Sequence, residues 1–173
     1  NENNTGSSVW GSYMHDEPAY EAAAVDAAAG KTDTAVYVLA RNSGEGSDRN
    51  AAKGDYYLSD NEKANLTMLG QKFENVVVVL NTGGILDTNF YNGKGGYGAD
   101  DEFNRGKIEG LDALLLMSQA GQNGGHAVVE VLNGTVNPSG KLTDTWAVDF
   151  VLLDKENKML GDAVGYRDSR CLL

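Results

Sequence analysis

The sequence predicts an α/β fold: a three-layer α/β/α sandwich around a mainly parallel sheet. Three apolar runs of strand length alternate with segments of helical character, and the runs are Thr34–Ala40, Val76–Asn81 and Leu111–Met117. Continuous rather than alternating hydrophobicity indicates strands that are buried on both faces. Alternation of strands and helices implies right-handed crossovers between parallel strands, with helices over both faces of the sheet.

The first helix is expected in the alanine-rich segment between Asp16 and Ala29. Asp16 is a candidate N-cap, Pro18 falls in the first turn, and Gly30 stands just past the end. All three positions carry residues that favour those places in a helix.

A second helix is expected after the motif Ser59-x-x-Glu62, which has the form of a capping box. Leu66, Leu69 and Phe73 then repeat on one stripe, which predicts a helix with one apolar face toward the core. The valine run of the following strand contains poor helix formers that suit the centre of a sheet.

In the C-terminal part, the sequence predicts a glycine-rich turn at Gly121–Gly125, followed by a helix that Gly134 ends. It also predicts one more strand at Lys141–Trp146. The stretch Asn89–Arg105 is the longest Gly- and Asp-rich segment and is expected to be a surface loop. The apolar face of the helix is marked by Ala127, Val128, Val131 and Leu132.

Length and composition bound the organisation of the chain. Its 173 residues suit one domain, expected at residues 16–150, with irregular segments at 1–15 and 151–173. A net charge of −11 disfavours nucleic acid and anionic membranes as partners. The single cysteine, Cys171, permits no internal disulfide. Asn1–Ser8 lacks the apolar core of a signal peptide, and the cytoplasm, the periplasm and secretion all remain open.

One carboxyl group stands out at the end of the first predicted strand. Glu45 lies between Gly44 and Gly46 in the loop Arg41–Arg49. In open α/β sheets ligands gather at the carboxyl ends of strands, and flanking glycines let a side chain project sharply. Spacing alone leaves a solvated turn with an Asp48–Arg49 charge pair as the other interpretation.

Other motifs are weaker. The turn Gly121–Gly125 opens a helix and is a candidate anion site, although it lacks the lysine of a phosphate-binding loop. The pattern Gly93-x-Gly95-x-x-Gly98 follows no strand and opens no helix, so we interpret it as chance. His126 has no second histidine at ligand spacing, and Asp100–Glu102 lies outside any calcium-binding pattern. The sequence therefore predicts neither a metal nor a cofactor.

Five segments in order resemble the α/β sandwich domain of family 3 glycoside hydrolases, the family of many β-glucosidases and β-xylosidases. Together they cover most of the chain from Asp33 to Trp146. The segments are Ser43–Arg49 (SGEGSDR) with Lys53–Ser59 (KGDYYLS), Val76–Gly84, Gly110–Gly125, Leu132–Gly134, and Asn137–Leu142 with Thr145-Trp146.

The resemblance implies a retaining, exo-acting hydrolase of β-glucosides or β-xylosides, in which Glu45 is the general acid/base. The family's nucleophile is an aspartate of a separate barrel domain, and no matching motif occurs here. The two carboxyl groups of a retaining glycosidase stand about 5 to 5.5 Å apart. The barrel domain of the same enzyme and a carbohydrate substrate are therefore the expected partners, and this chain alone is expected to be nearly inactive.

The acid form of Glu45 requires a pKa raised toward about 6 by apolar surroundings or a nearby negative charge. The resemblance further implies that Asp48 and Arg49 brace the loop, while Lys53 and Asp55 either brace it or approach the sugar. Two other functions stay open: a non-catalytic module that binds sugar or another domain, and an anion- or nucleotide-binding domain.

Overall fold

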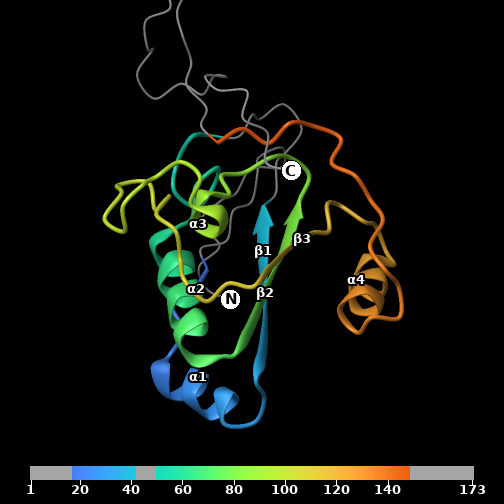
Figure 1. Cartoon of the computed structure of the whole chain (residues 1–173), viewed down its shortest axis with the longest axis horizontal. Coiled ribbons are helices and arrows are strands. Elements are labelled where there is room, and N and C mark those ends of the chain that lie inside the picture. Colours follow the sequence, from blue (N-terminus) through green and yellow to red (C-terminus); the bar gives the residue numbers. More distant parts are fainter. Residues whose placement is uncertain (1–16, 42–49, 149–173) are drawn as a thin grey trace, which may run out of the picture.

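The computed structural model describes residues 17–41 and 50–148, and they form a parallel sheet with helices on either side (Figure 1). The elements are α1 (Ala22–Ala29), β1 (Thr34–Arg41), α2 (Asp60–Lys72), β2 (Asn75–Thr82), α3 (Asn89–Asn92), β3 (Ala113–Leu116) and α4 (Gly124–Leu132). None of the helices in these ranges is long and apolar enough to cross a membrane.

The three strands lie in the order β1-β2-β3, and both pairs are parallel. β1 and β2 are in register along their whole length, whereas β3 pairs only with the stretch from Val77 to Leu80. The helices α1 and α2 lie on one side of the sheet and α4 on the other (Figure 1). The predicted fold class is confirmed.

The core lies between the sheet and α2. Val76, Val78 and Leu80 alternate along β2 with exposures of 0 to 1% and pack in one cluster with Leu66 and Leu69 of α2. This alternation gives β2 one face that is closed by a helix, as the apolar stripe of α2 predicts.

The predicted capping box at the start of α2 is confirmed. The hydroxyl of Ser59 accepts a hydrogen bond from the backbone N–H of Glu62 at 3.1 Å, and the Glu62 carboxylate accepts from the backbone N–H of Ser59 at 2.7 Å. Two N–H groups that a helix end leaves without intrahelical partners are thereby satisfied.

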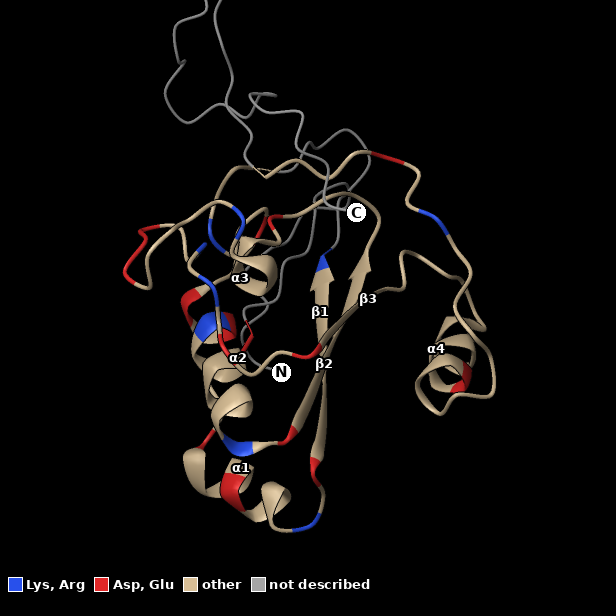
Figure 2. Cartoon of the chain, in the orientation of Figure 1, with Lys and Arg blue, Asp and Glu red and all other residues tan. Residues whose placement is uncertain are grey.

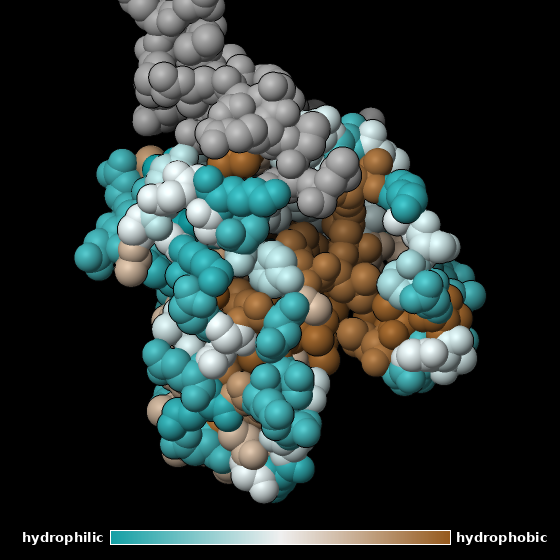
Figure 3. All heavy atoms as spheres, in the orientation of Figure 1, coloured by the Kyte–Doolittle hydropathy of each residue, from teal (hydrophilic) through white to brown (hydrophobic). Residues whose placement is uncertain are grey.

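The prediction that the strands are buried on both faces is wrong for β1 and β3, whereas β2 buries side chains on both faces, with Val78 and Val79 at 0% and 1% exposure. Val36 and Val38 of β1 are 48% and 54% exposed, and the residues of β3 are half-buried or exposed. Hydrophobic side chains are open to solvent between the sheet and α4 (Figure 3). The apolar runs are continuous, but among the described residues only one face of the sheet receives a closely packed helix.

α1 begins later than predicted. Its first residue is Ala22, its N-cap Glu21 makes no side-chain capping bond, and Pro18 lies before the helix. The Asn65 side chain of α2 fixes the residues that precede α1, since its oxygen accepts a hydrogen bond from the N–H of Tyr20 and its amide donates to the carbonyl of Pro18. A tertiary contact therefore competes with the local preference for a helix start. The predicted end at Gly30 is confirmed, and Asp16 lies outside the described residues.

The segment after β2 is more than the expected surface loop. It contains α3, whose Phe90 is fully buried, and it returns across α2 before β3 begins. A Cβ on Gly70 would lie 2.3 Å from the Glu109 carbonyl oxygen, and one on Gly110 would lie 2.2 Å from the Gly70 carbonyl oxygen. Only glycines at both positions permit this close crossing.

The predicted strand at Lys141–Trp146 does not form, and these residues run as irregular chain and bends. β3 is short, and no paired strand lies beside it in this stretch to supply hydrogen-bond partners. The helix predicted before it does form as α4, and Gly134 follows its end with a φ of 77°.

Candidate functional site

The carboxyl end of β1 leads into the predicted catalytic loop. β1 ends at Arg41, which lies one residue beyond the predicted strand end. Residues 42–49 fall outside the described part of the chain, and Glu45, Asp48 and Arg49 fall with them. The described chain resumes at Asn50, and the two segments that flank the loop, ending at Arg41 and beginning at Asn50, define the candidate site.

A buried ion pair joins the end of β1 to the start of α2. Two nitrogens of the Arg41 guanidinium donate to the two carboxylate oxygens of Glu62, at 2.6 and 2.7 Å. The side chains are only 2% and 8% exposed. Figure 2 shows the basic residue at the tip of the β1 arrow. Such a two-pronged pair fixes position as well as charge.

The same guanidinium also binds the returning chain, the stretch between the predicted loop and α2. Nε of Arg41 donates to the carbonyl of Asp55 at 2.6 Å, and a terminal nitrogen donates to the carbonyl of Tyr57 at 3.3 Å. Because Glu62 also caps α2 through Ser59, one network ties both ends of residues 42–49 to a rigid helix.

Asp55 lies in the returning chain, and its carboxylate accepts a hydrogen bond from the backbone N–H of Asn50 at 2.6 Å. Lys53 is exposed and pairs with Asp60 at 2.6 Å. That hydrogen bond, with a second from Asn104, holds the pKa of the Asp60 carboxyl below its usual value. The choice between loop bracing and sugar contact for Lys53 and Asp55 stays a prediction.

A hollow of about 480 Å³ opens beside the returning chain. Its walls combine the charged side chains of Lys53 and Glu102 with the ring of Phe103 and the polar side chain of Asn50. Hydrogen-bonding groups next to an aromatic face suit a ligand that carries both hydroxyl groups and apolar C–H surface.

Arg105 packs against Phe103, one of the residues that line this hollow. Its guanidinium carbon lies 3.7 Å from the ring centre of Tyr97, with the rings of Phe103 and Tyr57 at 5.2 and 5.6 Å. Arg105 also pairs with Asp101 at 2.9 Å. Burial alone would raise the pKa of the Asp101 carboxyl, but hydrogen bonds from Arg105 and from nearby backbone N–H groups outweigh it and lower that pKa.

The weaker sequence motifs gain no support as ligand sites. Gly93 caps α3 with a φ of 64°, which accounts for the first glycine of the dinucleotide-like pattern. His126 is exposed and lies 3.4 Å from Glu130. In residues 17–41 and 50–148 no three His, Cys, Asp or Glu side chains gather as metal ligands would.

Sequence reasoning missed Arg41 and the second role of Glu62. In the sequence Arg41 falls at the start of the predicted loop, and the motif Ser59-x-x-Glu62 predicts only a capping role for Glu62. A positive charge at the end of an apolar strand is the signal that could have found the pair, since a buried arginine requires a carboxylate.

Comparison with known proteins extends this picture. The profile of the Glycosyl hydrolase family 3 C-terminal domain matches residues 7–167. Beta-glucosidase A of Butyrivibrio fibrisolvens is 34% identical over 156 residues, which cover 78% of this chain and 17% of that protein. A beta-glucosidase of Ruminococcus albus is 35% identical over 143 residues, which cover 82% of this chain and 14% of that protein.

Solved structures give the same result. A beta-glucosidase from Paenibacillus barengoltzii superposes with a TM-score of 0.64 at 30% identity, over 78% of this chain and 13% of that one. Beta-glucosidase 3B from Thermotoga neapolitana in complex with glycerol superposes with a TM-score of 0.63 at 35% identity, over 75% of this chain and 16% of that one.

The matches differ in how much of each protein they cover. The chain spans only about a sixth of the length of its β-glucosidase relatives. A 35-residue stretch is 60% identical to a rhamnulokinase of Halalkalibacterium halodurans, but it covers only 20% of this chain and 8% of that protein. The profile match, by contrast, spans nearly the whole chain, and the chain therefore belongs to glycosyl hydrolase family 3, as its C-terminal domain.

Proposed function

We propose that this domain supplies the general acid/base of a retaining, exo-acting β-glucosidase, and that Glu45 is that residue. The observation that carries the proposal is the anchoring of its loop. The buried Arg41–Glu62 pair ties both ends of residues 42–49 to α2, at the edge of a parallel sheet where ligands gather. A loop that must aim one carboxyl group needs such a rigid base.

The chemistry requires two carboxyl groups. A carboxylate attacks the anomeric carbon, and Glu45 protonates the leaving oxygen as the glycosidic bond breaks. Glu45 then accepts a proton from the water that hydrolyses the glycosyl-enzyme intermediate. General acid/base catalysis of this kind contributes about 10² to 10⁴ in rate.

The other carboxylate is proposed to come from a barrel domain of the same enzyme. The small share of its relatives that this chain spans supports this division of labour. The substrate is proposed to be a β-glucoside, with β-xylosides as the alternative sugar. The hollow lined by Lys53, Glu102 and Phe103 is suited to the sugar side of such a substrate.

The loop's own charged residues complete the proposal. Asp48 and Arg49 brace the loop from within. Asp55 braces its return through the Asn50 N–H, while Lys53 is free to turn from Asp60 toward a sugar hydroxyl because their ion pair is exposed.

The isolated chain tests the division of labour. We expect no turnover of p-nitrophenyl β-glucoside above background, because the nucleophile is proposed to belong to the barrel domain. Turnover that Glu45→Gln abolishes would contradict the need for a second domain.

A chimera tests Glu45 itself. The corresponding segment of the Ruminococcus albus β-glucosidase is replaced by this chain, and Glu45→Ala is introduced. We expect kcat on phenyl β-glucoside to fall by about 10² or more, because the departure of phenol needs the general acid. On 2,4-dinitrophenyl β-glucoside, whose leaving group departs without an acid, we expect sodium azide to restore turnover with formation of glucosyl azide, because azide attacks the intermediate without base catalysis.

The matched control is Glu109→Ala, which removes an exposed carboxylate that pairs with Lys107. This variant is expected to keep full activity. If Glu45→Ala also keeps full activity, the domain is a non-catalytic module. If activity is lost and azide does not restore it, Glu45 is not the acid/base.

A further inference from the structure

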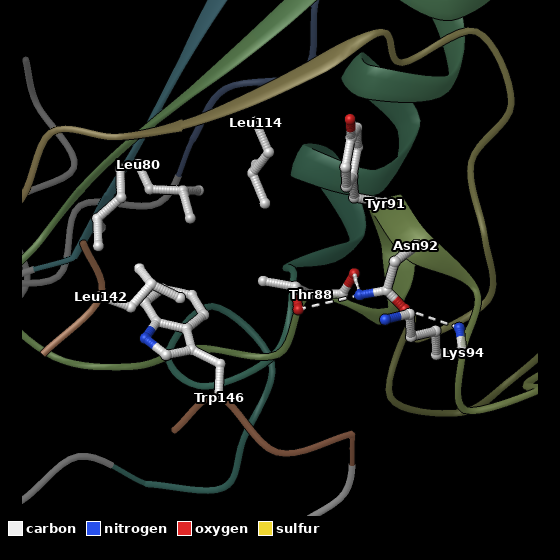
Figure 4. A pocket seen from close by; sticks show the side chains of 9 residues that line it. Leu80, Thr88, Tyr91, Asn92, Lys94, Leu114, Leu142 and Trp146 are labelled. Atoms are coloured by element: carbon white, nitrogen blue, oxygen red, sulfur yellow. Dashed lines mark hydrogen bonds between the residues drawn. The ribbon is translucent and has the colours of Figure 1, made fainter. Parts of the chain in front are cut away.

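A second hollow, of about 390 Å³, lies on the α2 side of the sheet, where β3 forms the edge. Its walls are mainly carbon, and Figure 4 shows the aliphatic side chains and one indole ring facing a common space. The wall residues that matter here are Leu80, Leu114, Leu116, Leu142 and Trp146.

Part of this apolar surface is open to solvent. Leu116 and Leu142 are 36% and 42% exposed, whereas Trp146 is 8% exposed and forms a fixed aromatic face. The nearby Tyr91 donates its hydroxyl to the carbonyl of Asp112 at 3.1 Å, so its polar end is already satisfied. A ligand that fills the hollow would cover leucine surface at no polar cost.

One end of the hollow is polar (Figure 4). The Asn92 amide donates to the hydroxyl oxygen of Thr88 at 3.1 Å, which leaves the hydroxyl proton of Thr88 available to donate. The Asn92 oxygen accepts from the backbone N–H of Lys94 at 2.7 Å. Within the described residues the Lys94 ammonium has no carboxylate partner. This end therefore offers donors to an oxygen atom.

We propose that this hollow binds an aromatic ring that carries an oxygen, the chemistry shared by free phenols and aryl β-glucosides. The ring stacks against Trp146 and is flanked by the leucines, while its oxygen accepts from Thr88 and Lys94. The net charge of −11 disfavours aromatic acids relative to neutral phenols.

The position of the hollow bears on whether the ring belongs to a substrate. Leu80 and Leu116 pair near the carboxyl ends of β2 and β3, at the same edge of the sheet as the end of β1. A role as the binding site for a substrate's leaving group rests on the proposed function, whereas binding of phenol does not.

Trp146 provides the test. The chain has two tryptophans, so Trp10→Phe leaves Trp146 as the sole reporter. Its fluorescence is followed during titration of the full chain with phenol, phenyl β-glucoside and methyl β-glucoside. We expect a saturable change with the first two and none with the third.

The ratio of the two affinities identifies the source of the ring. If phenyl β-glucoside binds at least about tenfold more tightly than phenol, the hollow is a leaving-group site. If the two affinities are equal, it is a site for free phenols. Absence of a saturable change with phenol, or the same change with methyl β-glucoside, overturns the proposal.

Variants locate the binding. Leu142→Ser is expected to weaken phenol binding by about fivefold or more, because it removes apolar wall area. Leu132→Ser removes a similarly exposed leucine of α4, outside the hollow, and is expected to change nothing. Lys94→Met, at an exposed position, is expected to weaken binding by about threefold without affecting the fold.

If neither Leu142→Ser nor Lys94→Met changes the affinity for phenol, the ring binds elsewhere and the proposal is overturned. Glu45→Gln is expected to leave phenol binding intact. A failure of the catalytic proposal and a failure of this one can therefore be told apart.

Discussion

Between α2 and α4 lies the clearest contrast in the molecule. α2 buries Leu66 and Leu69 against the sheet, at 0% and 7% exposure. In α4 only Gly124 is buried, and Val129 and Leu132 are 55% and 38% exposed. Both helices carry apolar stripes, and α4 is the more hydrophobic of the two in sequence.

The contrast teaches that an apolar stripe specifies a helix but not its packing partner. α2 is held by a capping box, a buried ion pair and a close glycine crossing, all of which fix it to the chain around it. α4 lacks a side-chain cap and stands beside a sheet face that remains open (Figure 3). The stability of the described fold is therefore concentrated in α1, β1, α2 and β2.

The largest effect is expected from breaking the ion pair in the packed half. Arg41→Met leaves the Glu62 carboxylate buried without its cation, and we expect the free energy of unfolding to fall by about 3 to 5 kcal/mol. Urea unfolding followed by circular dichroism measures the loss. Lys72→Met, which breaks an exposed pair between α2 and Asp26 of α1, is expected to cost less than about 1 kcal/mol.

A double variant sharpens this prediction. Arg41→Met with Glu62→Gln removes the buried charge but keeps a residue that can complete the capping box. It is expected to regain more than half of the lost stability. A double variant as unstable as Arg41→Met alone would show that the charge is not the cause.

The second prediction compares the two helices directly. Leu66→Ala in α2 is expected to lower the free energy of unfolding by about 2 to 5 kcal/mol, because it leaves a cavity in the core. Val129→Ala in α4 is expected to change it by no more than about 0.5 kcal/mol. Equal losses in the same urea experiment would mean that α4 is packed as tightly as α2.

The smallest effect is expected in the pH dependence of stability, through Asp101, the ion-pair partner of Arg105. The folded-state pKa of Asp101 is lowered, so its contribution to stability is full above the ordinary carboxyl pKa of about 4. That contribution is lost as pH falls through the lowered pKa, because the unfolded chain takes up the proton first. A melting temperature measured from pH 6 to pH 2 should fall less steeply in Asp101→Asn, and an identical slope contradicts the prediction.

Much of the fold could be predicted from local patterns. Four consecutive valines specify β2, and Ser59-x-x-Glu62 specifies the start of α2, because each depends on neighbours in the chain. The start of α1 could not be predicted, because the Asn65 side chain of another helix holds the preceding residues. The position of the candidate site after β1 stays a prediction, because residues 42–49 lie outside the described part of the chain. Arg41 could not be recognised as an anchor, because its partner Glu62 lies 21 residues away.

The sequence by itself determined the family and the parallel α/β class, since these depend on short motifs and on the period of hydrophobic residues; the role of Glu45 stays a prediction. Only the tertiary structure decided which apolar faces are covered, and it alone joined Arg41 to Glu62 across 21 residues. It also brought Trp146 to the edge of β3 as part of one hollow. The physical reason is that burial and ion pairing depend on distances in space, and residues far apart in the chain acquire those distances only when the sheet and helices pack.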